Sequence, residues 1–294
     1  NNIGFDLTGA QKRVIKEIRE DCRTGRQMNR LLQGDVGSGK TLVALMCMII
    51  AVENGYQACL MAPTEILAQQ HFKTISRMLG DLNMSVGILT GSTKAKAKRE
   101  TLQMLKEGKI DILIGTHILI EDYVEFANLA FCVIDEQHRF GVAQRAKLWK
   151  KNSPPPHILV MTATPIPRTL AMTLYGDLDY SVIDELPPGR KPIQTVCLPE
   201  SKRISLNFFL KEQIAEGRQV YMVFPLINES KSLELKDLMD GYERVSRDFP
   251  IPEYQLSIIH GQQKQDIQDY EMKRFADNET QIMVAATVIE VGVD

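Results

Sequence analysis

The sequence has no surplus of charge, because 35 Lys and Arg side chains nearly balance 37 Asp and Glu side chains, leaving a formal net charge of −2. Overall charge therefore gives no support to nucleic-acid binding, although a local basic track would suffice for it. No apolar run reaches the roughly 18 residues that indicate a membrane-spanning helix, so no membrane association is expected.

Cysteine spacing typical of metal or redox sites is also missing. The five cysteines form no CxxC pair. Cys47, Cys59 and Cys132 lie inside apolar runs, which predicts buried free thiols in a reducing cytoplasm. The first residues, Asn1–Gly4, contain neither an initiator Met nor a signal-peptide pattern, so we expect the sequence to begin inside a longer protein.

What the sequence does contain is a globular composition, with 44% hydrophobic and 24% charged residues over 294 positions, a length typical of about two domains. Short apolar runs alternate with amphipathic helical segments such as Lys40–Glu53 and Glu65–Leu79. Continuous apolar strands are typical of a parallel sheet covered on both faces, so the alternation predicts an α/β fold. Strands are predicted at Arg30–Gln33, Ala58–Ala62, Val86–Leu89, Ile110–Ile114, Phe131–Ile134 and Ile158–Met161.

A segment with three prolines and a glycine, Leu186–Pro192, interrupts this alternation and is the best candidate for a linker. We therefore predict a first domain at residues 1–186, a linker at 187–192 and a second domain at 193–294. The alternation resumes after the linker. Its predicted strands are Thr195–Leu198, Val220–Phe224, Leu256–Ile259 and Gln281–Ala285, and its predicted helices are Ile204–Glu216, Leu233–Met239 and Lys264–Phe275.

A glycine-rich loop follows the first predicted strand and matches the pattern G-x-x-x-x-G-K-[ST] in full. Its glycines allow the backbone to wrap a phosphate, and its N–H groups together with the next helix N-terminus attract negative charge. Lys40 would face the β- and γ-phosphates, and the Thr41 hydroxyl would bind Mg²⁺. The predicted nucleotide-binding residues are Gly34, Asp35, Val36, Gly37, Ser38, Gly39, Lys40 and Thr41.

A carboxylate pair follows a second apolar strand, where Phe131–Ile134 leads into Asp135 and Glu136. Carboxyl ends of parallel strands meet at one edge of a sheet, so we expect Asp135 beside the phosphate loop of a neighbouring strand. Asp135 can hold Mg²⁺, and Glu136 can polarise the attacking water as a general base. Together with the glycine-rich loop, these residues predict hydrolysis of a nucleoside triphosphate.

The segment Asp135–His138 is a DExH-type box, and Thr162-Ala-Thr164 follows on the next strand end. This combination resembles superfamily 2 helicases, with two RecA-like domains of the phosphate-loop NTPase class, the second of which is truncated here. Further blocks occur in that family's order: Ala62–Ala68, Thr90–Ser92, Gly115–His117 and Ala285–Asp294.

Longer blocks resemble the RecG family of bacterial branched-DNA helicases more closely. They include Gln33–Thr41, Ile134–Val142, Met161–Thr169, Tyr175–Arg190 and Pro225–Ser230. The resemblance implies an ATP-driven motor that uses Mg²⁺ and remodels stalled forks and junctions of double-stranded DNA in recombination and repair. It also implies a monomer in the bacterial cytoplasm and, as a family expectation, single-strand-binding protein as a partner.

The resemblance assigns roles residue by residue. Lys40, Asp135, Glu136 and His138 would be catalytic, with Thr41 and Asp135 on the metal. Phe5 and Gln11 would contact adenine, and Thr162 and Thr164 would couple hydrolysis to motion. The residues expected on DNA are Pro63, Thr64, Gly91, Ser92, Thr116, His117, His260 and Thr287.

Two departures from the family pattern limit what this piece alone is expected to do. Ala286 stands where relatives usually have threonine, which puts one phosphate contact in doubt. The sequence also ends before a motif VI arginine, a group worth on the order of 10³–10⁵ in rate in related NTPases. We therefore expect the piece to bind nucleotide, hydrolyse it poorly and leave forks intact without its missing domains.

Several alternatives stay open at this stage. Thr64 and Thr116 suit helix caps as well as phosphate contacts. The basic run Lys94–Arg99 suits a solvated helix face as well as a DNA-backbone track. The whole chain could belong to an Mfd-like transcription-repair translocase, or act as a nucleotide-binding module without unwinding activity.

Overall fold

The computed structural model of the chain describes residues 6–80, 82–135, 147–164, 178–185, 193–224, 231–260 and 263–286. The chain divides into two compact units, Asn1–Pro192 and Ile193–Asp294, and each is described by itself. The predicted linker at residues 187–192 lies outside the described residues. In the parts of the chain just given, no helix combines the length and the apolar character needed to cross a bilayer.

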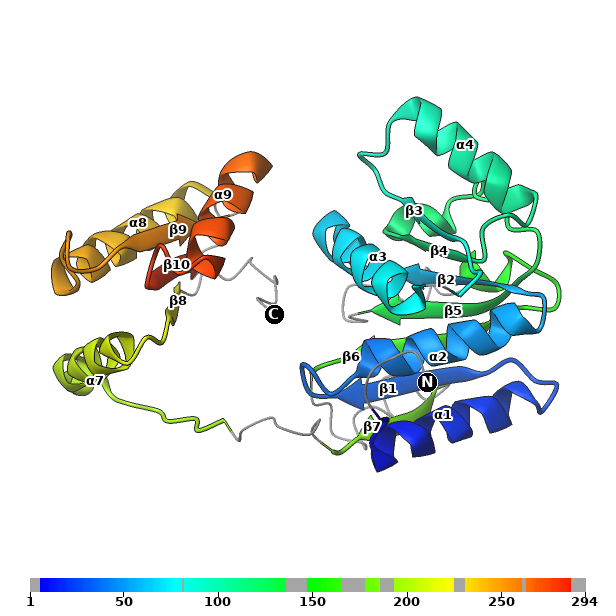
Figure 1. Cartoon of the computed structure of the whole chain (residues 1–294), viewed down its shortest axis with the longest axis horizontal. Coiled ribbons are helices and arrows are strands. Elements are labelled where there is room, and N and C mark those ends of the chain that lie inside the picture. Colours follow the sequence, from blue (N-terminus) through cyan, green and yellow to red (C-terminus); the bar gives the residue numbers. More distant parts are fainter. Residues whose placement is uncertain are drawn as a thin grey trace. The chain divides into compact units, whose positions relative to one another are not determined.

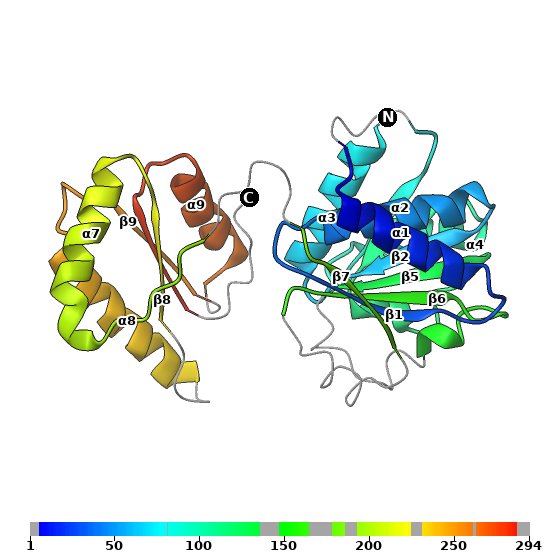
Figure 2. The same ribbon diagram turned by 90° about the horizontal axis from the view of Figure 1, so that it is seen from below.

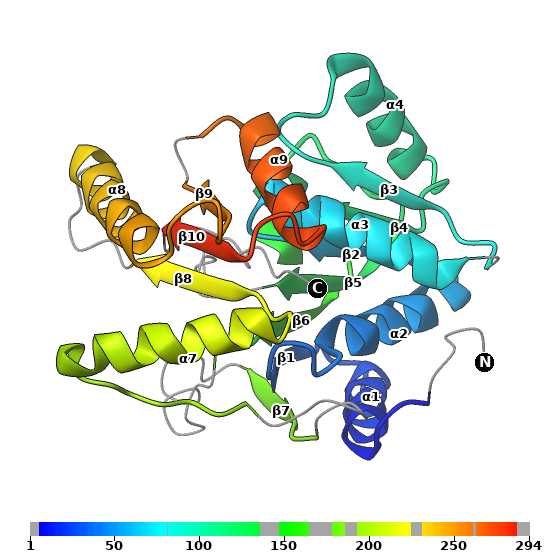
Figure 3. The ribbon, with the colours of Figure 1, turned by 60° about the vertical axis from the view of Figure 1, so that its left-hand side comes forward.

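The first unit is built on a seven-stranded parallel sheet with the order β3-β4-β2-β5-β6-β1-β7 (Figures 1 and 3). Its described elements are α1 (Gly9–Cys22), β1 (Asn29–Gly34), α2 (Lys40–Glu53), β2 (Gln57–Met61), α3 (Glu65–Leu79), β3 (Val86–Leu89), α4 (Ala95–Lys106), β4 (Ile112–Gly115), the 3₁₀ turn η1 (His117–Ile120), β5 (Leu129–Asp135), β6 (His157–Thr162) and β7 (Asp179–Ile183).

Both faces of this sheet are covered, which explains why its strands are apolar at consecutive positions. Leu32 of β1 and Leu60 of β2 pack in one core cluster with α1, α2 and α3. Their neighbours Leu31 and Cys59 pack in a second cluster with Leu105 of α4 and with η1. The predicted α/β fold is therefore confirmed, and the strands run parallel throughout this sheet.

Local sequence signals account for the helix ends of this unit. Thr8 is the N-cap of α1, and Thr8 and Gln11 form a capping box in which each side chain accepts from the other residue's backbone N–H. The predicted helices Lys40–Glu53 and Glu65–Leu79 are confirmed residue for residue as α2 and α3.

The second unit contains a three-stranded parallel sheet with the order β8-β10-β9 (Figure 3). Its described elements are η3 (Glu200–Lys202), α7 (Arg203–Ala215), β8 (Val220–Phe224), α8 (Lys231–Asp248), β9 (Leu256–Ile259), α9 (Gln265–Ala276) and β10 (Ile282–Ala286). Helices α7 and α8 pack on one face of the sheet and α9 on the other (Figure 2).

The structure corrects two expectations about strands. Residues 195–198, predicted as a strand, form none in the structure, and their side chains, including those of Val196 and Leu198, are exposed. This short run between two prolines does not pair with a sheet, and an unpaired run of this length is not stable as a strand. Conversely, β7 was not predicted. It pairs only with β1 at the edge of the sheet, and its pattern of partly exposed and buried residues lacks a continuous apolar run.

The expected burial of three cysteines as free thiols is confirmed. Cys47, Cys59 and Cys132 are buried and free. Cys59 on β2 and Cys132 on β5 are register partners in neighbouring strands, so they fill the core as small apolar side chains.

A half-buried histidine makes the first unit sensitive to acid. Nδ1 of His157, the first residue of β6, accepts a hydrogen bond from the Met28 N–H at 3.0 Å. To accept this bond, Nδ1 must carry no proton, so the ring must be neutral. Burial lowers the pKa of His157 below its ordinary value, against a smaller opposing effect of Asp21. The unfolded chain therefore binds this proton more readily than the folded chain as the pH falls through about 6.5.

We predict that His157→Asn reduces the loss of stability between about pH 7.5 and about pH 5.5, because the asparagine oxygen can still accept the Met28 N–H but does not titrate. Urea unfolding of both proteins at several pH values measures the difference in slope. The exposed His117→Asn is the control and should leave the slope unchanged. Equal slopes for His157→Asn and the unsubstituted protein would contradict the prediction.

Candidate nucleotide and nucleic-acid site

The phosphate loop, residues 34–41, joins β1 to α2 at the carboxyl edge of the first sheet. Gly37 and Gly39 have left-handed backbones, with φ of 73° and 87°. A Cβ on Gly39 would lie 2.3 Å from Nε2 of Gln11, and one on Gly34 would lie 2.5 Å from Oγ of Ser38. The loop therefore needs glycine at position 37 for conformation, at position 34 for space and at position 39 for both.

The polar groups of the loop are arranged as an anion cradle. The Lys40 ammonium group donates to the carbonyls of Gly34 at 2.8 Å and Asp35 at 3.0 Å, so it is held over the start of the loop. Oγ of Ser38 is buried without a hydrogen-bond partner among the described residues. Thr41 is the second residue of α2, where helix N–H groups and the helix dipole favour a phosphate. These residues fit a nucleotide with a metal ion.

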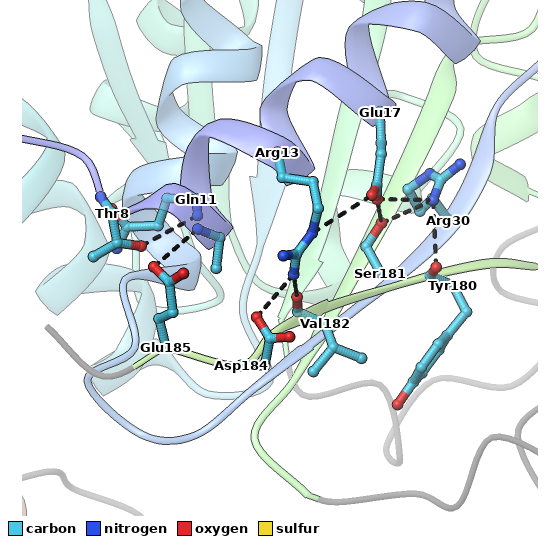
Figure 4. A network of polar contacts seen from close by, with 11 residues as sticks. Thr8, Gln11, Arg13, Glu17, Arg30, Tyr180, Ser181, Val182, Asp184 and Glu185 are labelled. Atoms are coloured by element: carbon cyan, nitrogen blue, oxygen red, sulfur yellow. Dashed lines mark hydrogen bonds and ion pairs between the residues drawn. The ribbon is translucent and has the colours of Figure 1, made fainter.

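Gln11, which Figure 4 shows beside Thr8 at the start of α1, connects the first helix to this loop. Its side-chain amide donates to the Ser38 carbonyl at 2.9 Å, while its oxygen accepts from the Thr8 N–H at 3.0 Å. The structure thus brings Gln11 to the phosphate loop, whereas Phe5 lies outside the described residues. Asp35 and Val36 are exposed at the outer side of the loop.

The first helix is held against β7 by a polar network (Figure 4). Glu185 accepts from the Ala10 N–H at 3.0 Å, and Arg13 donates to Asp184 at 2.8 Å. This hydrogen bond from Arg13 lowers the pKa of Asp184. The largely buried Arg30 pairs with Asp21 and Glu17 on α1, and its guanidinium also donates to Ser181 on β7.

Asp135 ends β5, and its position corrects the expected strand order. The strand that neighbours the phosphate-loop strand β1 is β6, which pairs with β5 on its other side. Asp135 is therefore two strands from the phosphate loop. The Asp135 side chain is 13% exposed, and its Oδ2 lies 2.7 Å from Nε2 of His71 on α3. Glu136 and His138 lie outside the described residues.

Thr162 ends β6 and is the register partner of Gln33, the last residue of β1 before the phosphate loop. Its buried Oγ1 accepts from the Thr164 N–H at 3.1 Å. Tyr180 of β7 donates to the Gln33 side chain at 2.7 Å. The loop, Thr162 and Asp135 thus follow three adjacent strands, β1, β6 and β5, which we name the nucleotide half of the edge.

The first-unit residues expected on DNA follow three further adjacent strands, β3, β4 and β2, which we name the nucleic-acid half. Thr64 caps α3 by accepting from the Leu67 N–H at 3.3 Å. Glu65 then accepts from both the backbone N–H of Ser92, at 2.9 Å, and its hydroxyl, at 2.6 Å. This contact joins Pro63-Thr64, after β2, to Gly91-Ser92, after β3.

Thr116 and His117 follow β4 in the same half, and one expectation about them was wrong. The segment after Thr116 is a four-residue 3₁₀ turn, η1, and the Thr116 side chain makes no capping hydrogen bond. Thr116 is buried, whereas His117 is exposed. Capping therefore does not explain Thr116.

Two members of the basic run at the start of α4 interact with neighbouring side chains. Lys96 lies 3.9 Å from the Glu100 carboxylate. Lys98 donates to the Tyr123 hydroxyl at 3.0 Å and lies over the Tyr123 ring. Lys94, Lys96 and Arg99 are exposed. These charges come shortly after Ser92 in the sequence, because α4 is the element that follows β3 and the Gly91-Ser92 segment of the nucleic-acid half.

In the second unit, His260 follows β9, and burial lowers its pKa. Its Nδ1 is buried and has no hydrogen-bond partner in the described part of the chain. Thr287 lies outside the described residues, as does Gly261 beside His260. Since the two units are not placed relative to each other, the structure does not relate His260 to the first unit.

Sequence reasoning missed two residues that link the predicted ones, Glu65 and His71. Glu65 directly follows the predicted Thr64, so its place at a helix start was a usable signal. The pairing of His71 with Asp135 joins residues 64 positions apart and had no local signal. Among the residues that the structure describes, no group of three or more His, Cys, Asp or Glu side chains is placed to hold a metal ion.

We predict that Gly39→Ala weakens nucleotide binding at least tenfold, because the added Cβ displaces Gln11 from the loop. Lys40→Ala should abolish nucleotide binding, because it removes the positive charge that faces the phosphates. Isothermal titration with ATP measures both. Gly55→Ala is the matched control, since Gly55 has a similar φ of 82° but nothing within 4 Å of the added Cβ. It should share the conformational cost of about 1–2 kcal/mol and bind ATP normally.

Comparison with known families matches almost the whole chain. Residues 8–173 match the DEAD/DEAH box helicase family, and residues 202–294 match the helicase conserved C-terminal domain. The chain is 47% identical over 292 residues to the ATP-dependent DNA helicase RecG of Synechocystis sp. and 50% identical over 293 residues to that of Aquifex aeolicus. Each alignment covers 99% of this chain but only 35% and 37% of these relatives, so the chain spans about a third of their length.

Solved structures give the same result. A structure of RecG bound to a three-way DNA junction matches with a TM-score of 0.79 and 40% identity, over 99% of this chain and 37% of that one. The DUF1998 helicase MrfA bound to DNA has a TM-score of 0.69 at 19% identity, over 99% of this chain and 44% of its own, which shows the fold alone. The resemblance to the RecG family and the two-unit RecA-like fold are confirmed. An Mfd-like translocase and a module without unwinding activity are not favoured.

Proposed function

Because the chain belongs to the DEAD/DEAH box helicase family, we propose that it is the motor region of an ATP-dependent DNA helicase that remodels branched double-stranded DNA. The observation that carries the proposal is the order of strands along one sheet edge. The nucleotide half and the nucleic-acid half are contiguous there, so one rigid sheet supports both groups of residues.

Family membership implies ATP with a divalent metal ion, which we take to be Mg²⁺. In this proposal the N–H groups of the phosphate loop and Lys40 hold the triphosphate, and Gln11 with Phe5 holds the base. Thr41 and Asp135 hold the ion, which neutralises charge on the phosphates when bound.

The remaining residues of the nucleotide half would either transfer protons or signal to the rest of the motor whether nucleotide is bound. Glu136 takes the proton of the attacking water as general base. His138, Thr162 and Thr164 link the occupied nucleotide site to the rest of the motor. The buried hydroxyl of Thr162, beside Gln33 at the start of the loop, supports this role by its place on β6.

On the nucleic-acid half, the proposed contacts are to the DNA backbone, which fixes position without reading sequence. Pro63, Thr64, Gly91, Ser92, Thr116 and His117 supply them from the first unit, and His260 and Thr287 from the second. From the family resemblance we also carry forward a monomeric state, a bacterial cytoplasmic location, roles in recombination and repair, and single-strand-binding protein as a partner.

The proposed function predicts that ATP hydrolysis by the full-length protein is stimulated more by a three-way DNA junction than by linear duplex, and least by RNA of equal length. A coupled assay of phosphate release at saturating ATP measures these rates. Glu136→Gln is the control for turnover, since it should bind ATP but hydrolyse almost none. Equal stimulation by RNA, or none by DNA, would reject the proposal.

The same function predicts a phosphate track at the start of α4. Replacing the exposed Lys94 and Arg99 by glutamine should weaken DNA binding and lower the slope of log affinity against log salt by about 0.9 for each DNA phosphate that is no longer neutralised. Fluorescence anisotropy of a labelled junction between low and moderate salt measures the slope.

The matched control removes two positive charges at and just beyond the other end of the helix. Lys106 pairs with Glu125, and Lys109 pairs with Glu107, each at 2.6 Å, so both charges are already compensated. Their double replacement by glutamine should leave the salt slope unchanged. If both double variants change it equally, α4 acts only through net charge and the track is wrong.

A further inference from the structure

Helix α3 reaches from the nucleic-acid half to the nucleotide half of the sheet edge. At its start, Glu65 holds the backbone and hydroxyl of Ser92. Six residues later, His71 lies with Nε2 2.7 Å from Oδ2 of Asp135. At a rise of 1.5 Å per residue these two contacts are about 9 Å apart along the helix axis.

The contact between His71 and Asp135 is shielded from solvent. The two side chains are 12% and 13% exposed. An ionised carboxylate only accepts hydrogen bonds, so Nε2 of His71 donates to Asp135. In such surroundings a charge-assisted hydrogen bond restricts the rotation of the carboxylate more than it would at a surface.

The body of α3 is packed firmly enough to move as one piece. Ala68, Ile75 and Leu79 are buried in the core cluster that the helix shares with the sheet. The Ala68 N–H donates to the Thr64 carbonyl at 3.0 Å, so the first turn is closed between the two contacts. The segment between the Ser92 contact and His71 is therefore continuous, packed helix.

Resting on the proposed function, we propose that His71 is a positioning residue that orients Asp135 for the divalent ion and links that carboxylate to the nucleic-acid half through α3. In this arrangement the imidazole holds one carboxylate oxygen, Oδ2, and the other oxygen would bind the ion. Hydrogen-bond partners that orient a metal-binding carboxylate in this way are typically worth about 10–100-fold in metal affinity or activity.

The first test measures metal binding without turnover. In the full-length protein, binding of Mn²⁺ in the presence of ADP is followed by the electron paramagnetic resonance signal of the free ion. His71→Leu keeps apolar bulk but has no donor, and we expect about 10–100-fold weaker Mn²⁺ binding. His71→Gln places an amide donor at a similar reach and should restore affinity to within a few-fold of the unsubstituted protein.

The matched control is Gln69→Ala on the same helix, because Gln69 is exposed and touches neither half. It should bind Mn²⁺ as the unsubstituted protein does. If His71→Leu fails to fold, His71→Asn replaces it, since its shorter amide does not reach Asp135 and should show the same weak binding. Unchanged Mn²⁺ affinity in a folded Leu or Asn variant would overturn the proposal.

The second test measures the link between the two halves. Junction DNA affinity is determined with and without ADP, Mg²⁺ and beryllium fluoride, and the ratio of the two affinities is the coupling. His71→Leu should bring this ratio towards one while DNA affinity without nucleotide stays the same. A ratio equal to that of the unsubstituted protein would overturn the link.

The outcomes separate this proposal from the function on which it rests. If the unsubstituted protein fails to bind the junction or shows no coupling, the proposed function is wrong. If it shows both and the folded His71 variants match it, the function stands and the role of His71 is wrong.

Discussion

Parallel pairing of β5, β6 and β1 is the constraint on which the rest of the first unit depends. The phosphate loop, Thr162 and Asp135 lie at one edge only because these strands run in the same direction and in one register. Burial of both sheet faces by α1–α3 and by α4 with η1 holds that register, since a slip by one residue would exchange the two apolar faces. The same strand pairing thus determines both how the core packs and which side chains lie together at the candidate site.

The sequence predicted those parts of the fold that depend on local patterns. Lys40–Glu53 and Glu65–Leu79 could be read because apolar periodicity, a glycine-rich loop and an N-cap threonine mark them. The edge strand β7 could not, because its stability comes from pairing with β1 and from contacts with α1 rather than from an apolar run. Residues 195–198 show the reverse error, an alternating pattern without a partner strand.

The candidate site divides in the same way. The phosphate loop and the Asp135 strand were recognisable from their residues, since each glycine and charge has a local reason. The insertion of β6 between their strands and the contact of His71 with Asp135 depend on the order in which distant strands assemble. No spacing along the chain encodes that order, so sequence reasoning predicted that these strands end at one edge but not which strands are neighbours.

The separation of the sheet edge into two contiguous halves also has an evolutionary consequence. Residues after β3, β4 and β2 can change to suit another polynucleotide while those after β5, β6 and β1 stay under selection for the nucleotide. Related motors that descend from one ancestor can then change the nucleic acid they bind without changing the residues that bind the nucleotide.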